Sequence, residues 1–302
     1  MEHHLFLTEL THEAIIYLDG RKIEDFLQGQ LTCDLRQLGP DTAVHGALCS
    51  AKGRVISDLW VLQLSDERCV LRLRRSLAES FAAHLARFAQ FSRISVTLDE
   101  RDGTVFGIHG AAPELLPLKT AGDCRATDGA LCLRSGPTQA QLVLTSSARS
   151  SGDAITEVLA AMDCATTASG TEAAWRAEEL RQGHYALETD DSERFTPQAL
   201  NYDERGLVSF QKGCYTGQEV VARLHYKGKS KQRLQIFTAP AGYHPEIGAS
   251  LFLDGASTGT VLRHETDASG QTIIAAMIPA AHRATALTDG QGEELTPVQA
   301  MP

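Results

Sequence analysis

The octet at residues 212–219, KGCYTGQE, constrains this chain more than any other stretch. It places Cys214 between two glycines, with Lys212 two residues upstream. Paired glycines are typical of a turn in which the backbone comes close to another group. Residues 218–224 have the composition of a helix start, with Glu219 in the first turn, where the helix dipole favours a carboxylate. The octet therefore predicts a tight turn that carries a cysteine into a helix.

This setting predicts a reactive thiol at Cys214. A cysteine that lies ahead of a helix N-terminus and near a lysine is favoured as the thiolate, so Lys212 is a candidate supporting group. The alternative is that Cys214 is a small buried hydrophobe, as free cysteines commonly are.

Length and composition limit the class of protein. A chain of 302 residues with 43% hydrophobic content can bury a substantial core and form two or three domains. The sequence has no run of 18 apolar residues and its N-terminus does not resemble a secretory signal, which predicts no membrane partner. Seven cysteines without a CxxC pair indicate reduced thiols. We expect a cytoplasmic protein.

The charge of the chain is unevenly distributed. A net charge of −10 argues against nucleic-acid binding by the whole surface. Residues 205–233, however, contain seven Lys or Arg against one Glu. Such a face could bind an anionic ligand, such as a polyglutamate tail or nucleic-acid phosphate. The alternative is an ordinary solvated surface loop.

Hydrophobic periodicity predicts mixed α and β structure up to about residue 235. A short buried strand is expected at residues 207–210, an amphipathic helix from Ser76 onward, and another helix over residues 155–162. After residue 235 the chain changes to short strands separated by Gly-containing turns, which fits a small barrel or sandwich. We therefore expect an α/β region over residues 1–235 and a β domain over residues 236–302.

The octet also carries a family resemblance. Together with the following VVAR and a Lys/Arg-rich run, it resembles the signature of the YgfZ family of folate-binding proteins. That family is related to the glycine-cleavage aminomethyltransferase (T-protein) and includes a mitochondrial branch that supports iron–sulfur cluster maturation. Three further stretches resemble family blocks: FLQGQLTCD at 26–34, SAKGR at 50–54 and TPQALN at 196–201.

The resemblance implies an α+β fold of the aminomethyltransferase type. That fold is a three-part ring with two α/β portions, which we expect to be intertwined within residues 1–235, and a small C-terminal β-barrel. It also implies tetrahydrofolate or another reduced folate as the cofactor, held at the centre. Trp175 matches a family tryptophan near the pterin, and an indole is a suitable stacking surface. The alternative for Trp175 is a core residue of an amphipathic helix.

Two positions depart from the family pattern. Glu13 stands where the family has its other pterin-side tryptophan, and Arg181 stands where the aminomethyltransferases have a glutamate two residues before a glycine. The Arg181 departure counts against glycine cleavage itself. Both leave the preferred folate form and its affinity open.

The motif blocks supply the remaining site candidates. Asp34 is the candidate acid–base residue, with turn capping as its alternative. Lys52 could pair with a folate carboxylate as a point charge, or be an exposed turn lysine. Further candidate folate contacts are Gln30, Tyr215, Gln218 and Arg223. No Cys/His ligand spacing or four-cysteine cluster predicts a metal site, and whether Cys33 or Cys49 lies near Cys214 stays open.

Three functional hypotheses follow. The first is a tetrahydrofolate-binding accessory protein that supports assembly or repair of iron–sulfur clusters in client enzymes, including tRNA-modifying ones, with Cys214 as the reactive thiol. The second is a folate-dependent one-carbon transferase, so whether the chain is an enzyme stays open. The third is a tRNA-binding protein that uses residues 205–233.

Overall fold

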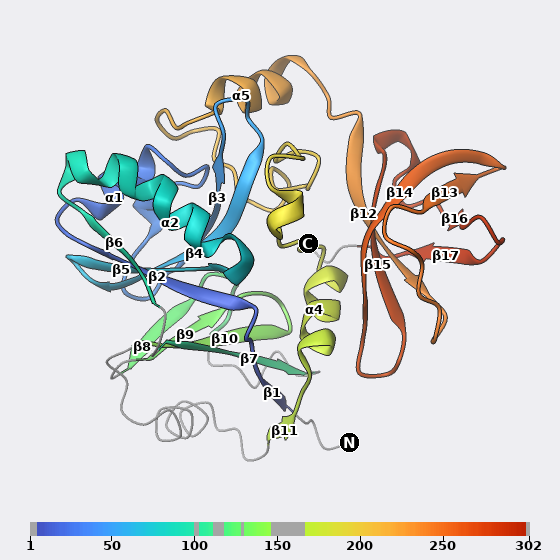
Figure 1. The fold of residues 1–302 in the computed structure, drawn as a ribbon, viewed down its shortest axis with the longest axis horizontal. Coiled ribbons are helices and arrows are strands. Elements are labelled where there is room, and N and C mark those ends of the chain that lie inside the picture. Colours follow the sequence, from blue (N-terminus) through green and yellow to red (C-terminus); the bar gives the residue numbers. More distant parts are fainter. Residues whose placement is uncertain (1–4, 100–102, 111–117, 128–129, 146–166, 300–302) are drawn as a thin grey trace. The chain divides into compact units, whose positions relative to one another are not determined.

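The computed structural model describes residues 5–99, 103–110, 118–127, 130–145 and 167–299. The helix expected over residues 155–162 lies outside these ranges. The chain forms two compact units (Figure 1). The first comprises Met1–Gly170, Ala186–Arg194 and Gly206–Glu219, and the second comprises Thr171–Tyr185, Phe195–Arg205 and Val220–Pro302.

A five-stranded antiparallel sheet in the order β3-β4-β5-β2-β6 forms one half of the first unit. Its strands are β2 (Glu13–Asp19), β3 (Val44–Cys49), β4 (Val55–Ser65), β5 (Arg68–Arg74) and β6 (Ser95–Leu98). Helices α1 (Ile23–Gln28) and α2 (Arg75–Ala89) lie against one face of this sheet (Figure 1), and their apolar residues join its core cluster. The α2 helix confirms the amphipathic helix expected near Ser76. Short 3-10 turns follow at η1 (Leu35–Gln37), η2 (Gln90–Ser92) and η4 (Thr189–Asp191).

The other face of this sheet carries buried charge. Because side chains alternate along a strand, Leu71 and Leu73 of β5 face the helices while Arg72 and Arg74 face away. Glu13, at the start of β2, is 1% exposed and pairs with Arg72 at 3.0 Å and with Arg74. Glu13, which departs from the family pattern, is therefore the counter-ion of two buried guanidinium groups.

A six-stranded sheet in the order β11-β1-β7-β10-β9-β8 completes the first unit. Its strands are β1 (Leu5–Glu9), β7 (Thr104–Gly110), β8 (Cys124–Thr127), β9 (Ala130–Arg134), β10 (Gln139–Leu144) and β11 (Thr167–Ser169). Every pair is antiparallel except β1 with β11. One face is covered by its own apolar cluster, centred on Leu5, Ile108 and Leu142.

The second unit is built on a closed barrel in the order β12-β15-β14-β13-β16-β17. Its strands are β12 (Gln232–Ala239), β13 (Ser250–Leu253), β14 (Ala256–Thr266), β15 (Thr272–Pro279), β16 (Leu287–Thr288) and β17 (Glu294–Pro297), with a 3-10 turn at η5 (Ala280–His282). The interior is filled by buried residues such as Phe237, Leu251 and Ile274. Helix α4 (Glu172–Arg181) packs against β14 and β15.

These parts confirm the α+β prediction, with two α/β portions and a C-terminal barrel. The barrel begins at Gln232, close to the expected change of character. The ranges 1–235 and 236–302 stay predictions as domain limits. Among the described residues, no helix has the length and apolar character needed to cross a membrane.

The buried ion cluster predicts a stability difference between two glutamates. Glu13→Gln should lower the free energy of unfolding by about 3 kcal/mol, because it leaves two buried guanidinium groups without their shared counter-charge. The control is Glu67→Gln, which breaks the exposed pair with Arg21 and should cost less than about 1 kcal/mol. Urea unfolding curves measure both, and equal losses would contradict the assignment.

Candidate functional site

The side chain of Lys212 joins the octet at residues 212–219 to the block at residues 26–34. Its Nζ atom donates hydrogen bonds to the backbone carbonyls of Gln28 at 2.7 Å, Leu31 at 2.6 Å and Cys33 at 2.7 Å. An ammonium group has three N–H donors, so these three bonds use all of them. Lys212 therefore anchors the cysteine octet to the block at residues 26–34.

The buried position of Lys212 also affects its charge. Only 7% of the residue is exposed, and burial lowers its pKa to about 8. The three carbonyl oxygens oppose this shift because they accept hydrogen bonds from the charged ammonium. The geometry shows Lys212 as an anchor, and its support of the Cys214 thiolate stays a prediction.

Thr32 makes a second connection between the same segments. Its Oγ1 atom donates to the carbonyl of Leu207 at 2.6 Å, and its own carbonyl accepts from the Ser209 backbone N–H at 2.9 Å. The strand expected at residues 207–210 is therefore wrong, because this backbone bonds a threonine instead of a neighbouring strand. Leu207 and Val208 are buried, as their apolar character predicted.

Gly217 brings the octet against the turn at residues 50–54. Its φ angle is +84°, and a Cβ atom built there would lie 2.4 Å from the Ser50 carbonyl oxygen and 3.2 Å from the Gly53 Cα. At Gly213, by contrast, no heavy atom of the described residues lies within 4 Å of such a Cβ, apart from those of Gly213 and its two chain neighbours. The predicted close backbone approach is therefore confirmed at Gly217 and is wrong for Gly213.

Cys214 is exposed on the loop between these two glycines. The other described cysteines are all buried, namely Cys33, Cys49, Cys69, Cys124 and Cys132. Burial raises the pKa of the Cys33 and Cys49 thiols to about 12, so both stay protonated at neutral pH. Helix α5 (Gln218–Lys227) starts four residues after Cys214. The alternative of a buried Cys214 is wrong, and this thiol is the one described sulfur that a reagent or partner can reach.

The octet meets the segments at residues 26–34 and 50–54 at a junction. Three polar atoms of these segments are buried without a hydrogen-bond partner among the described residues. They are the hydroxyl of Tyr215, Oε1 of Gln30 and Oγ of Ser50. Tyr215 is 7% exposed, its ring centroid lies 5.3 Å from the Lys212 Nζ, and burial raises the pKa of its phenol. Unpaired buried polar atoms are costly and call for an explanation such as a bound ligand.

A buried acid–base pair lies on β3 and β4, and the sequence reading missed it. The Asp58 carboxylate is 3.4 Å from Nε2 of His45 and accepts the Leu187 backbone N–H at 3.1 Å. The His45 ring stacks on Trp60, with centroids 4.4 Å apart. The sequence signal is a lone carboxylate inside the apolar strand VISDLWVL.

Comparison with known proteins places the chain in a family. A curated protein from Sodalis glossinidius, named tRNA-modifying protein YgfZ, is 32% identical over 273 residues, which is 86% of this chain and 81% of that protein. The chain belongs to the YgfZ family. A YgfZ protein of the same name from Escherichia coli O157:H7 is 30% identical over 89% of this chain and 84% of its own length. No family model matches the sequence.

A solved structure supports the fold. The glycine cleavage aminomethyltransferase T from Bartonella henselae superposes with a TM-score of 0.72 at 18% identity, covering 99% of this chain and 86% of that one. The aminomethyltransferase-like fold expected from the YgfZ resemblance is therefore confirmed.

Two residues suggested by the YgfZ resemblance have simple local roles. Asp34 caps η1, accepting the Arg36 backbone N–H and hydrogen bonds from the Arg36 guanidinium and Gln28. The Arg36 hydrogen bonds hold the pKa of Asp34 well below its usual range, which favours the capping alternative over acid–base work at neutral pH. Lys52 is exposed in the turn between β3 and β4, and its contact with folate stays a prediction.

The second unit holds two more of the YgfZ-derived candidates. Trp175 lies in α4 and has no exposed surface, while Arg223 is exposed on α5. Arg181, the second departure from the pattern, pairs with Asp267 and lies 3.5 Å from the Glu178 carboxylate. The proposed folate contacts of Trp175 and Arg223 stay predictions.

The basic stretch at residues 205–233 is less available than its composition suggests. Lys212 is buried, Arg205 donates to the Gln182 carbonyl, and Arg233 pairs with Asp203 at 2.7 Å. The exposed cations that remain are Arg223, Lys227, Lys229 and Lys231. Of the seven cations that predicted a basic face at residues 205–233, only these four side chains are exposed.

The two octet glycines should respond very differently to a methyl group. Gly217→Ala should lower the free energy of unfolding by about 3 kcal/mol, since the added carbon meets backbone atoms in a left-handed conformation. Gly213→Ala, the matched control, should change it by less than about 0.5 kcal/mol. Denaturant unfolding of both variants tests this, and a tolerated Gly217→Ala would refute the close contact.

Proposed function

We propose that this YgfZ-family protein is a reduced-folate-binding accessory factor that supports iron–sulfur enzymes through the thiol of Cys214. The observation that carries the proposal is the exposure of Cys214 on a loop held at both ends. Lys212 fixes the loop on one side and Gly217 on the other. A nucleophile held in this way pays little ordering entropy when it meets a partner.

The junction around the octet fits a reduced folate. A pterin ring presents hydrogen-bond donors and acceptors along one edge, which suits the unpaired Tyr215 hydroxyl, Gln30 Oε1 and Ser50 Oγ. The exposed Lys52 suits a folate carboxylate. The family resemblance adds Trp175, Gln218 and Arg223 as contacts. When bound, tetrahydrofolate supplies a carrier for one-carbon units.

The thiol chemistry proposed for Cys214 is exchange at sulfur. The Cys214 thiolate attacks a disulfide or persulfide on a partner protein, forms a new S–S bond, and displaces the other sulfur as a thiolate. This step needs solvent access, which Cys214 has and the other described cysteines lack. The curated relatives are named tRNA-modifying proteins, and this name favours client enzymes that modify tRNA. We place this activity in the cytoplasm.

The second candidate is a folate-dependent one-carbon transferase, and the His45–Asp58 pair favours it. A buried carboxylate beside an imidazole is able to move a proton during transfer of a carbon unit. The two proposals differ in whether the folate is chemically changed.

Calorimetric titration with tetrahydrofolate tests the cofactor. We expect saturable binding, weakened by Trp175→Ala and weakened about threefold to tenfold by Tyr215→Phe. Tyr215→Phe is the sharper variant, because it removes only a hydroxyl that has no hydrogen-bond partner among the described residues, so it should not lower thermal stability. Absence of binding by the unaltered protein would end the folate proposal. Mass spectrometry of the recovered folate separates an unchanged ligand from a transferase substrate.

Cys214→Ser tests the thiol in cells. In a bacterium that lacks its own YgfZ protein, the variant should fail to restore the activity of an iron–sulfur tRNA-modifying enzyme while its thermal unfolding and folate titration match those of the parent. Cys69→Ser, at a buried cysteine, is the matched control and should restore activity if it folds. Full restoration by Cys214→Ser would exclude the thiol mechanism.

A further inference from the structure

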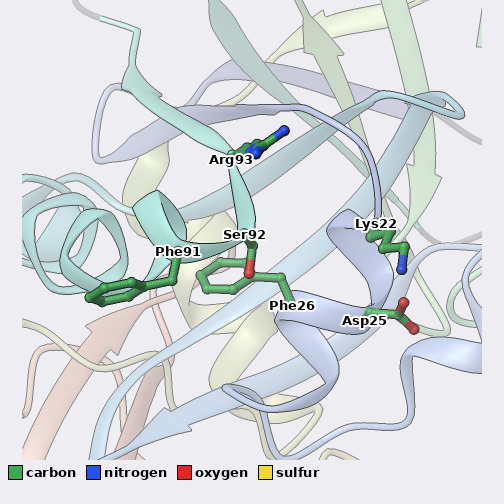
Figure 2. A pocket seen from close by; sticks show the side chains of 6 residues that line it. All are labelled: Lys22, Asp25, Phe26, Phe91, Ser92 and Arg93. Carbon is green, nitrogen blue, oxygen red and sulfur yellow. The ribbon is translucent and has the colours of Figure 1, made fainter.

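A separate hollow of the first unit has the composition of a ligand site (Figure 2). Its volume is about 330 Å³, near the lower end of the roughly 300–1,000 Å³ range of ligand pockets. The start of α1 and the turn η2 supply its lining, which consists of Lys22, Asp25, Phe26, Phe91, Ser92 and Arg93. Two aromatic rings and two cations thus share one small pocket.

Both cations are held in an unusual backbone conformation. Lys22 has a φ angle of 63° and Arg93 one of 55°, and the described chain has only six non-glycine residues with positive φ. Glycine adopts this conformation with less strain than any other residue. Both side chains are exposed and make no ion pair or side-chain hydrogen bond within the described residues. The chain therefore carries two available positive charges where local stability would favour glycine.

Phe91 adds an exposed flat surface to the same pocket. Its exposed fraction is 83%, the largest of any large hydrophobic residue described, while Phe26 in the pocket wall is 8% exposed. Figure 2 shows the Phe26 ring beside Ser92 and the Phe91 ring farther out, with Arg93 above Ser92 and with Lys22 and Asp25 on the side away from Phe91. An exposed aromatic ring that shares a pocket with cations is the arrangement with which proteins stack a nucleobase and neutralise its phosphate.

We propose that this pocket binds an unpaired nucleotide of single-stranded RNA. Phe91 stacks on the base, Lys22 and Arg93 contact the phosphates, and the Asp25 carboxylate accepts a hydrogen bond from a base amino group. A neighbouring hollow of about 290 Å³ shares Lys22 and Asp25 but adds further carboxylates. The RNA backbone therefore leaves the pocket past Arg93.

The net charge of −10 makes this a local site and sets the expected strength of binding. Long-range repulsion weakens RNA binding at low salt, so affinity depends on base stacking at Phe91 as well as on the two cations. A base that is already stacked inside a duplex cannot insert. The pocket therefore selects single strands over duplexes. This inference does not rest on the folate proposal or on Cys214.

Fluorescence anisotropy with a labelled single-stranded RNA of about ten nucleotides tests the site in the full-length protein. We expect saturable binding, weaker binding of the matching duplex, and a loss of about fivefold or more in Phe91→Ala. Phe88→Ala is the matched control, because Phe88 is an exposed neighbour on α2 that does not line the pocket. It should bind RNA like the parent.

Arg93→Gly separates binding from folding. Glycine relieves the left-handed strain, so the thermal midpoint should stay the same or rise. RNA affinity should fall, and the slope of log K against log salt should decrease by about 0.7, the value for one lost phosphate contact on a single strand. The proposal is overturned by absence of saturable RNA binding, or by equal effects of Phe91→Ala and Phe88→Ala. The folate affinity of the same variants should be unchanged. Failure of the RNA proposal can therefore be distinguished from failure of the folate proposal.

Discussion

A single buried ammonium group holds the candidate site together. Lys212 Nζ donates to three carbonyls of the segment at residues 28–33, which lies about 180 positions earlier in the chain. Removing a lysine from water is costly, and three hydrogen bonds to backbone oxygens offset that cost only in one loop position. The hydrogen bonds of the charged Lys212 ammonium therefore fix the position of the cysteine loop. In this position Lys212 is buried and Cys214 stays exposed to solvent.

The buried charge on the five-stranded sheet follows the same logic. Glu13 is stable in the interior because two guanidinium groups surround it, and Arg72 and Arg74 are stable because Glu13 is there. A tryptophan at position 13, as the family resemblance implies, would remove the counter-charge that the two buried cations share. The departure at Glu13 is therefore coupled to the arginines of β5, and any comparison of folate sites within the family should treat these three residues together.

Sequence reasoning predicted the parts of the structure that depend on local pattern. The helix after the octet, the strands of the barrel and the turn at Gly217 all follow from periodicity or glycine placement. Sequence reasoning failed where the local structure depends on a hydrogen-bond partner from a distant segment of the chain. Residues 207–210 are apolar enough for a strand, but their backbone bonds Thr32. Likewise the carbonyl acceptors of Lys212 and the pairing of Asp58 with His45 involve segments far apart in the chain, which a local pattern cannot reveal.

Lys22 and Arg93 have positive φ angles, a conformation that normally favours glycine, and both residues lie at the same pocket. A chain under selection for stability alone would place glycine at both left-handed positions. Here both positions carry a long cationic side chain, both line one hollow, and the most exposed phenylalanine described, Phe91, lines the same hollow. Strained residues persist where surrounding structure and function retain them. The coincidence of strain, free charge and an exposed ring therefore argues for a ligand at this pocket more strongly than any one of the three features does.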